Sequence, residues 1–253
     1  MKRGRAIVVL FAAIFCLLAP PVLPAPSAQL PGSAFAPKRP QKRAPAPAKP
    51  PTKLFEPQDL GLLEGPDREE WQKPDLIMDA LRTAEGSVVA DLGAGGGWFS
   101  VRLARRVGPR GRVYAEDIQP QMIDAIRARV DRENLPNLVT VLGTADDPRL
   151  PQGIDAVLIV GSFHEMQFDE ASKRRDPIAL LQNVARSLKP DGRLGVVDFL
   201  PGSGGPGPDA DQRVDPQSVI KAATAAGLQF LKREEVPPFE YLLIFGRASG
   251  ATR

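Results

Sequence analysis

The sequence is almost without cysteine and histidine: Cys16 and His164 are the only residues of either kind among 253. A single cysteine excludes a disulfide framework, a cysteine-type zinc site and a two-cysteine redox centre. With one histidine, a metal site would have to be built mainly from carboxylates, and we expect none. The hydrophobic content of 43% and the charged content of 25% are ordinary for a globular protein. Collagen, coiled coil and wholesale disorder are therefore excluded.

Acidic residues are absent from the first 55 positions, which contain nine Lys or Arg. Residues 56–253 then hold 24 basic and 30 acidic residues, so the net charge of +3 hides two regions of opposite sign. A nucleic-acid-binding domain carries its basic stripe on the folded domain itself. We therefore expect no nucleic-acid partner.

Residues 1–25 have the pattern of a signal peptide. Lys2, Arg3 and Arg5 precede the apolar run Ala6–Ala19, which is shorter than the ~20 residues that span a bilayer. The pattern predicts export to the periplasm or the medium. An uncleaved anchor that keeps the protein near the membrane is the alternative, and a wrongly chosen start codon is a third reading.

Residues 26–57 are predicted to be a basic, proline-rich linker. Twelve prolines fall within residues 20–57, and such a stretch buries too little apolar surface to offset its chain entropy. The folded domain is expected over residues 58–248, with a short tail at 249–253.

From residue 66 onward the apolar pattern alternates between strands and helices. The predicted helices are Pro74–Thr83, Trp98–Val107, Pro120–Arg132, Pro177–Leu188 and Pro216–Ala225. The predicted strands are Ser87–Leu92, Arg112–Ile118, Leu138–Leu142, Ala156–Val160, Leu194–Phe199, Phe230–Glu234 and Tyr241–Phe245. This alternation indicates a mostly parallel sheet covered on both faces, and the two final strands indicate an antiparallel hairpin at its edge.

A glycine-rich turn, Gly93–Gly97, joins the strand that ends at Leu92 to the helix that begins at Trp98. A dinucleotide fingerprint would need glycine where Trp98 stands, and a phosphate-binding loop would need a lysine. Asp91, two residues before the first glycine, would repel a pyrophosphate and attract an ammonium or sulfonium group. The turn therefore favours a cationic nucleoside over NAD or ATP.

Acidic residues also follow the next two strands. Asp117 ends the second strand, where it can accept hydrogen bonds from both ribose hydroxyls, and Ile118 can lie against an adenine ring. Asp146 and Asp147 follow the third strand, where an acid can bind the adenine amino group. Each acid alone also fits a helix cap or a turn, but their recurrence at successive strand ends favours a binding site.

Three segments together resemble the class I S-adenosylmethionine-dependent methyltransferases. They are Asp91-Leu92-Gly93-Ala94-Gly95-Gly96-Gly97, Tyr114-Ala115-Glu116-Asp117-Ile118-Gln119-Pro120-Gln121-Met122 and Leu188-Lys189-Pro190-Asp191-Gly192-Arg193-Leu194. The resemblance covers about Trp71 to Gly246. It implies a Rossmann-like α/β fold with a seven-stranded sheet in the order 3-2-1-4-5-7-6, strand 7 being antiparallel, and helices on both faces.

The resemblance also implies S-adenosylmethionine as cofactor, bound at the carboxyl ends of strands one to four. Asp91 and Gly93 would hold the methionine amine, Asp117 and Ile118 the ribose and adenine, and Ala145 with Asp146 would border the adenine. The remaining cofactor-binding candidates are Gly95, Gly97 and Gly161. Members that recognise arsenite need several cysteines, which this chain lacks.

His164 follows the fourth strand, at the edge where the methyl group would lie, and is the candidate general base. A structural histidine under the next helix is the alternative. The glycine- and proline-rich stretch 201–208 is expected to be either a mobile lid over the acceptor or an exposed insertion, and Trp71–Lys73 are weaker candidates for the pocket wall.

The sequence thus predicts an exported methyltransferase that acts on a small-molecule acceptor. A non-catalytic, exported nucleoside-binding module is the main alternative, and an NAD-dependent oxidoreductase is a more distant one. The sequence names neither the acceptor nor the oligomeric state.

The amino-terminal region has no periodic apolar face with which to pack against a domain. We therefore expect a chain that begins at Thr52 to melt at the same temperature as the full chain in a thermal denaturation experiment. A drop of several degrees on truncation would contradict this prediction.

Overall fold

The computed structural model describes residues 54–166, 177–202 and 204–248. All of them lie in one compact unit, Pro47–Arg253. The predicted signal segment, nearly all of the predicted linker and the tail lie outside the described residues. Within the described ranges, no helix is both long and apolar enough to cross a membrane.

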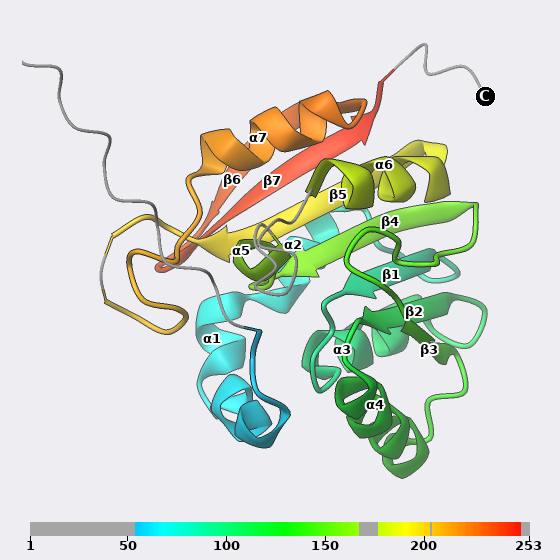
Figure 1. The fold of residues 1–253 in the computed structure, drawn as a ribbon. Helices are drawn as coiled ribbons and strands as arrows, with labels where there is room; N and C mark the ends of the chain where they lie inside the picture. The colour runs from blue at the N-terminus through cyan, green and yellow to red at the C-terminus, as the bar shows by residue number, and fades with distance from the viewer. Residues whose placement is uncertain (1–53, 167–176, 203, 249–253) are drawn as a thin grey trace, which may run out of the picture. The chain divides into compact units, whose positions relative to one another are not determined.

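The core is a seven-stranded sheet in the order β3-β2-β1-β4-β5-β7-β6, which confirms the predicted order (Figure 1). The first five strands pair in parallel, and β7 runs antiparallel to both β5 and β6. The strands are β1 (Val88–Leu92), β2 (Arg112–Asp117), β3 (Leu138–Leu142), β4 (Ile154–Val160), β5 (Leu188–Phe199), β6 (Leu228–Val236) and β7 (Glu240–Arg247).

Helices cover both faces of this sheet. Buried apolar side chains of α2 (Pro74–Ala80), α3 (Trp98–Val107) and α4 (Pro120–Glu133) form one layer of the core. Those of α6 (Pro177–Ser187) and α7 (Pro216–Ala225) form the other, on the opposite side of the sheet in Figure 1. Successive side chains along each strand point to opposite faces of the sheet and pack into the two layers in turn, as expected for a parallel sheet that is buried on both faces.

Helix boundaries follow local chemistry. Pro120 and Pro216 stand in the first turns of α4 and α7, where a missing N–H costs nothing. Asp215 caps α7 by accepting a hydrogen bond from the Gln217 amide. Asn134 ends α4 in the left-handed conformation.

Three short elements, and the start of one strand, differ from the predicted pattern. The 3-10 helix η1 (Pro57–Glu64) has no buried residue, and α1 (Arg68–Gln72) and α5 (Phe163–Met166) are too short to show a helical period. Strand β5 begins at Leu188 rather than Leu194. Its first residues pair irregularly with β4 through a register shift near Ile154, so they lack the alternation typical of a strand.

Gly111, in the turn between α3 and β2, has no room for a side chain. A Cβ there would lie 2.5 Å from Cβ of Val107 and 2.6 Å from the carbonyl oxygen of Ser87. We expect Gly111→Ala to lower the free energy of unfolding by about 1–3 kcal/mol, the usual cost of overpacking, measured by urea denaturation. Gly61→Ala is the matched control, because nothing lies within 4 Å of a Cβ at that position. Equal stability of the two variants would contradict the prediction.

Candidate cofactor and acceptor site

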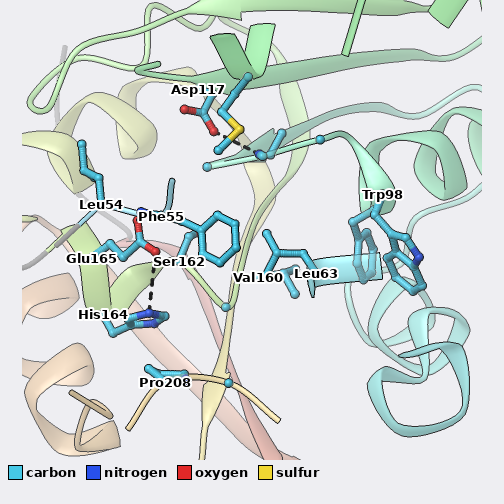
Figure 2. Close-up of a pocket in the computed structure, with 18 of the residues that line it drawn as sticks. Leu54, Phe55, Leu63, Trp98, Asp117, Val160, Ser162, His164, Glu165 and Pro208 are labelled. Carbon is cyan, nitrogen blue, oxygen red and sulfur yellow. Dashed lines mark hydrogen bonds and ion pairs between the residues drawn. The ribbon is translucent and has the colours of Figure 1, made fainter. Parts of the chain in front are cut away.

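A cavity of about 620 Å³ opens at the carboxyl ends of β1, β2, β4 and β5. Ligands of open α/β sheets bind at this edge, and the volume suits a small-molecule site. The sequence-predicted residues Asp91, Gly93, Gly95, Asp117, Ile118, Ala145, Gly161 and His164 all line it. Figure 2 shows Asp117 and His164 on opposite sides of this cavity, with Phe55 between them.

The glycine turn is shaped by backbone that only glycine adopts readily. Gly93, Gly95 and Gly97 have φ values of +66°, +54° and +79°. A Cβ on Gly95 would point toward Leu60 and Leu63 of η1, across the cavity, at 3.8–3.9 Å. The turn therefore presents bare backbone to the cavity, while Gly97 lies beneath it against Ile126 and does not line the wall.

Asp91 is a nearly fully buried carboxylate at the end of β1, with 2% of its surface exposed. Its Oδ2 accepts a hydrogen bond of 2.6 Å from the Ser100 hydroxyl on α3. Burial raises the pKa of Asp91 to about 6, against the lowering effects of Ser100 and of the Arg68 guanidinium. A buried acid with so few donors is well suited to bind an ammonium group.

Asp117 is fixed at the end of β2 by backbone amides. Its two oxygens accept hydrogen bonds from the amides of Gly95 (3.0 Å) and Gln119 (2.9 Å). Burial raises its pKa, and these amides oppose that rise. Each carboxylate oxygen keeps a lone pair, so the pair of oxygens can still accept a ribose diol.

The loop after β3 departs in part from the prediction. Thr144 and Ala145 line the cavity, whereas Asp146 is exposed and stands outside its wall. The Asp146 carbonyl instead accepts a hydrogen bond from the Asn183 amide, and Asp147 closes a turn by accepting from the Arg149 amide. Asp147 therefore has the turn role that the sequence allowed, and Asp146 is exposed outside the cavity wall.

The amino-terminal segment covers the cavity, although the sequence assigns its first residues to the linker. The Phe55 amide donates to Glu165 (3.3 Å), and the Phe55 carbonyl accepts from the Gln119 side chain (3.1 Å). Phe55 thus bridges the loop after β2 and helix α5. Trp71 and Gln72 of α1 line the cavity as anticipated, but Lys73 does not.

Arg68 of α1 was not anticipated from the sequence. Among the described residues that line the cavity, it is the only Lys or Arg. Its guanidinium lies 4.2 Å from the centroid of the Trp98 ring and donates to the Gln72 side chain at 2.7 Å. Burial lowers its pKa to about 10, although the nearby carboxylates of Glu240 and Asp91 oppose the shift. No local pattern marks such a residue as part of the cavity, because the Trp98 ring and the Glu240 carboxylate that lie near it come from α3 and β7.

His164, on α5, is held by Asp198 at the end of β5. The His164 amide donates to Oδ2 of Asp198 at 3.1 Å, and its Nδ1 lies 3.3 Å from Oδ1. Asp198 is fully buried. Burial acts to lower the pKa of His164, but the hydrogen bond and charge of Asp198, with a contribution from Glu165, outweigh it and raise the pKa. The pKa of His164 therefore lies above the value near 6.5 of an unperturbed imidazole.

Asp198 also settles which imidazole nitrogen is available. A carboxylate accepts a hydrogen bond, so Nδ1 carries the proton in the neutral ring and Nε2 is left as the basic atom. The sequence reading missed Asp198, because it lies 34 residues beyond His164 in a strand that otherwise reads as apolar core.

Glu240, at the start of β7, forms a second buried polar pair. Both of its oxygens accept from the Gln72 side-chain amide, at 2.7 and 2.8 Å. Burial raises the pKa of Glu240 to about 8, Gln72 and Arg68 lower it, and the Asp198 charge adds to the rise. Glu240 lies in the cavity wall and was also missed by the sequence reading.

The glycine- and proline-rich stretch after β5 forms part of the wall. The buried Arg213 donates to the carbonyls of Gly204 (2.8 Å), Pro208 (3.1 Å) and Pro206 (3.2 Å). A Cβ on Gly207 would lie 2.5 Å from the Phe199 ring. Within the described residues, this stretch is therefore held by hydrogen bonds and forms part of the cavity wall.

The cavity fits S-adenosylmethionine in its donor set and shape. Asp91 matches the methionine ammonium, Asp117 matches the ribose diol, and the glycine turn leaves space that a Cβ at Gly95 would fill. The acidic wall that suits a sulfonium ligand would oppose a pyrophosphate.

Comparison with known proteins agrees with this geometry. Residues 89–192 match the model of a methyltransferase domain family. The chain is 38% identical over 125 residues to an uncharacterised methyltransferase of Mycobacterium bovis, covering 49% of this chain and 44% of that protein. It is 30% identical over 143 residues to an arsenite methyltransferase of Halobacterium salinarum, covering 56% of this chain and 34% of that protein. The chain thus spans less than half the length of these curated relatives.

Among solved structures, a SAM-dependent methyltransferase from Aquifex aeolicus superposes with a TM-score of 0.69 at 24% identity, covering 76% of this chain and 98% of that one. The fold is therefore that of the class I methyltransferases. Together with the match of residues 89–192 to a methyltransferase domain, this fold implies S-adenosylmethionine as the cofactor.

The raised pKa of Asp91 predicts how cofactor binding depends on pH. An ammonium ligand needs the ionised carboxylate, so the affinity for S-adenosylhomocysteine should fall as the pH drops through about 6, by up to tenfold per pH unit. Calorimetric titration between pH 5 and pH 8 measures this. Asp91→Asn is the matched control, with weaker binding at pH 8 and a shallower pH dependence. Equal wild-type affinity at pH 5 and pH 8 would contradict the prediction.

Proposed function

We propose that the protein transfers a methyl group from S-adenosylmethionine to a small-molecule nucleophile, with His164 as the general base. The observation that carries the proposal is that His164, whose ring is held by the buried Asp198, lines the same cavity as Asp91 and Asp117. A cofactor site alone would need no oriented base beside it.

Residues at different places in the cavity have different roles in the proposed reaction. Asp91, Asp117 and the glycine turn bind and orient the cofactor, which when bound supplies an electrophilic methyl group on a sulfonium. Phe55 and residues of η1 form part of the cavity wall. Positioning the acceptor atom about 3–3.5 Å from the methyl carbon, in line with the carbon–sulfur bond, supplies much of the acceleration.

Proton transfer is the task of His164. A bound cofactor would supply the methyl group to the acceptor atom by cleavage of its carbon–sulfur bond, and the electron pair of that bond would stay on sulfur. The proton displaced from the acceptor passes to Nε2 of His164. The Asp198 carboxylate stabilises the imidazolium that forms and holds the ring in place, so Asp198 is a positioning residue.

Three observations weigh against other functions and against one other acceptor. Asp91 and Trp98 occupy the turn where a dinucleotide needs an uncharged wall and a glycine, which disfavours an NAD-dependent oxidoreductase. A non-catalytic binding module would have no use for the buried His164–Asp198 pair. Arsenite is a poor acceptor candidate, since the chain has only Cys16 to bind it.

The amino-terminal sequence supports the further proposal that the protein is exported, or is tethered to the membrane by an uncleaved segment. Cell fractionation with an antibody against the folded domain tests this. Recovery of the full-length chain in the cytoplasmic fraction alone would refute it.

The catalytic assignment predicts separate effects on binding and turnover. His164→Ala should lower methyl transfer by about 10²–10⁴-fold while the affinity for S-adenosylhomocysteine changes little. Wild-type activity should rise with pH through an apparent pKa above 6.5, because Asp198 favours the protonated ring. Asp198→Asn should move that pKa downward. The assay uses methyl-labelled cofactor with a small-molecule extract as the source of acceptor.

Asp117→Ala is the contrasting variant, because it should weaken cofactor binding itself. Losing one or two charge-assisted hydrogen bonds of about 1.5–3 kcal/mol each lowers the affinity at least tenfold. Near-normal turnover in a folded His164→Ala variant would remove the base from the mechanism. Tight binding of NAD with no binding of S-adenosylhomocysteine would overturn the proposed function as a whole.

A further inference from the structure

The part of the cavity around His164 has a distinctive set of side chains. We call it the acceptor compartment and define it by Trp71, His164, Glu165, Phe199, Gln212 and Glu240, all of which line the cavity. It stands apart from Asp117 and the loops assigned to ribose and adenine. Its charged side chains are carboxylates and one imidazole.

Two carboxyl groups face the acceptor compartment. Glu165 lies beside the base, with Oε1 3.9 Å from Nε2 of His164, as the dashed line in Figure 2 marks. Glu240 is fully buried; it accepts hydrogen bonds from the neutral Gln72 side-chain amide, and the charge of the Arg68 guanidinium opposes only part of the rise in pKa that burial causes. Burying a carboxylate with so little compensation is costly. A cation or strong hydrogen-bond donor in the compartment would offset that cost.

The described part of the cavity wall has little positive charge with which to bind an anionic acceptor. Among the described residues of the cavity wall only Arg68 carries a guanidinium, against nine Asp or Glu. Arg68 is already engaged by the Gln72 side chain and the Trp98 ring. A carboxylate or phosphate acceptor would enter the compartment against the charges of Glu165 and Glu240.

Aromatic rings complete the wall. Trp71 packs with its centroid 6.2 Å from that of Phe199 and 6.2 Å from that of Phe239. Aromatic faces attract cations and also pack well against a flat apolar body. Acidic groups beside aromatic faces are a combination that recognises organic ammonium groups.

We propose that the acceptor compartment takes an amine, whose nitrogen lies among Glu165, Glu240 and His164 and receives the methyl group. The inference rests on the proposed function and specifies its substrate class.

The charge balance of the reaction supports this choice. An ammonium acceptor first gives a proton to Nε2 of His164 and becomes a neutral amine. The nitrogen lone pair then bonds to the methyl carbon as the carbon–sulfur bond breaks, so the positive charge moves from sulfur to nitrogen. Carboxylates placed beside the nitrogen stabilise that charge as it develops, which is selective stabilisation of the transition state. For an oxyanion acceptor the charge would instead be neutralised, and the same carboxylates would oppose formation of the oxyanion.

Three probes with a shared phenol ring and two-carbon arm test the charge preference: tyramine, 4-hydroxyphenylacetate and 4-ethylphenol. Calorimetric titration at pH 8.5, above the pKa of about 8 that burial gives Glu240, uses the full-length protein saturated with S-adenosylhomocysteine, so that no methyl transfer occurs. We expect tyramine to bind at least tenfold more tightly than 4-hydroxyphenylacetate, with 4-ethylphenol between them. If tyramine binds no better than the carboxylate, or none of the three binds, the inference is wrong.

Variants then assign the preference to the two carboxyl groups. Glu240→Gln and Glu165→Gln keep the shape of each side chain, and each should lower the tyramine preference severalfold while affinity for S-adenosylhomocysteine stays within threefold. Glu235→Gln, at an exposed position on β6, is the matched control and should change nothing. Melting curves establish that each variant is folded, and either single variant suffices if the other does not fold.

The outcomes separate the two proposals. A wild-type protein that fails to bind S-adenosylhomocysteine would refute the proposed function. A protein that binds it but keeps its full tyramine preference in both Gln variants would refute only the role of Glu165 and Glu240.

Discussion

Buried carboxylates at one edge of the sheet are the constraint around which this structure is organised. Asp91, Asp117, Asp198 and Glu240 are each at most 6% exposed, and each must find donors in a place that water hardly reaches. The donors come from elsewhere: a hydroxyl on α3, backbone amides of the glycine turn, an imidazole on α5 and an amide on α1. The active-site edge of the sheet is thereby tied to every element that surrounds it.

The buried carboxylates lower the stability of the unliganded protein and favour the binding of cationic ligands. An isolated carboxylate in the interior destabilises the fold, since its ionised form loses hydration. The raised pKa values of Asp91 and Glu240 express that cost. A ligand that brings positive charge restores the missing partners, so the groups that weaken the unliganded protein are those that favour a cationic cofactor and, by our inference, a cationic acceptor.

The amino-terminal segment from Phe55 to Gln72 also joins parts of the cavity that are distant in the sequence. Arg68 and Gln72 reach from α1 to Trp98 and Glu240, and Phe55 bridges the two sides of the cavity. One short stretch of chain therefore closes the cavity and supplies its guanidinium. Sequence reading placed part of this stretch in the linker, because η1 has no buried residue and so shows no periodic apolar signal.

The sequence by itself determined the alternation of strands and helices, the glycine turn and the acids at the ends of two strands, because those features depend on local patterns. The strand order followed from the resemblance to a known family, which the same motifs carry. The sequence could not decide that Asp146 faces solvent, that Asp198 orients His164, or that Gln72 meets Glu240 across 168 residues. Such pairings are set when helices and strands distant in the chain pack together. Only the tertiary structure brings their side chains within hydrogen-bonding distance, and the chemistry of the acceptor compartment is made of those contacts.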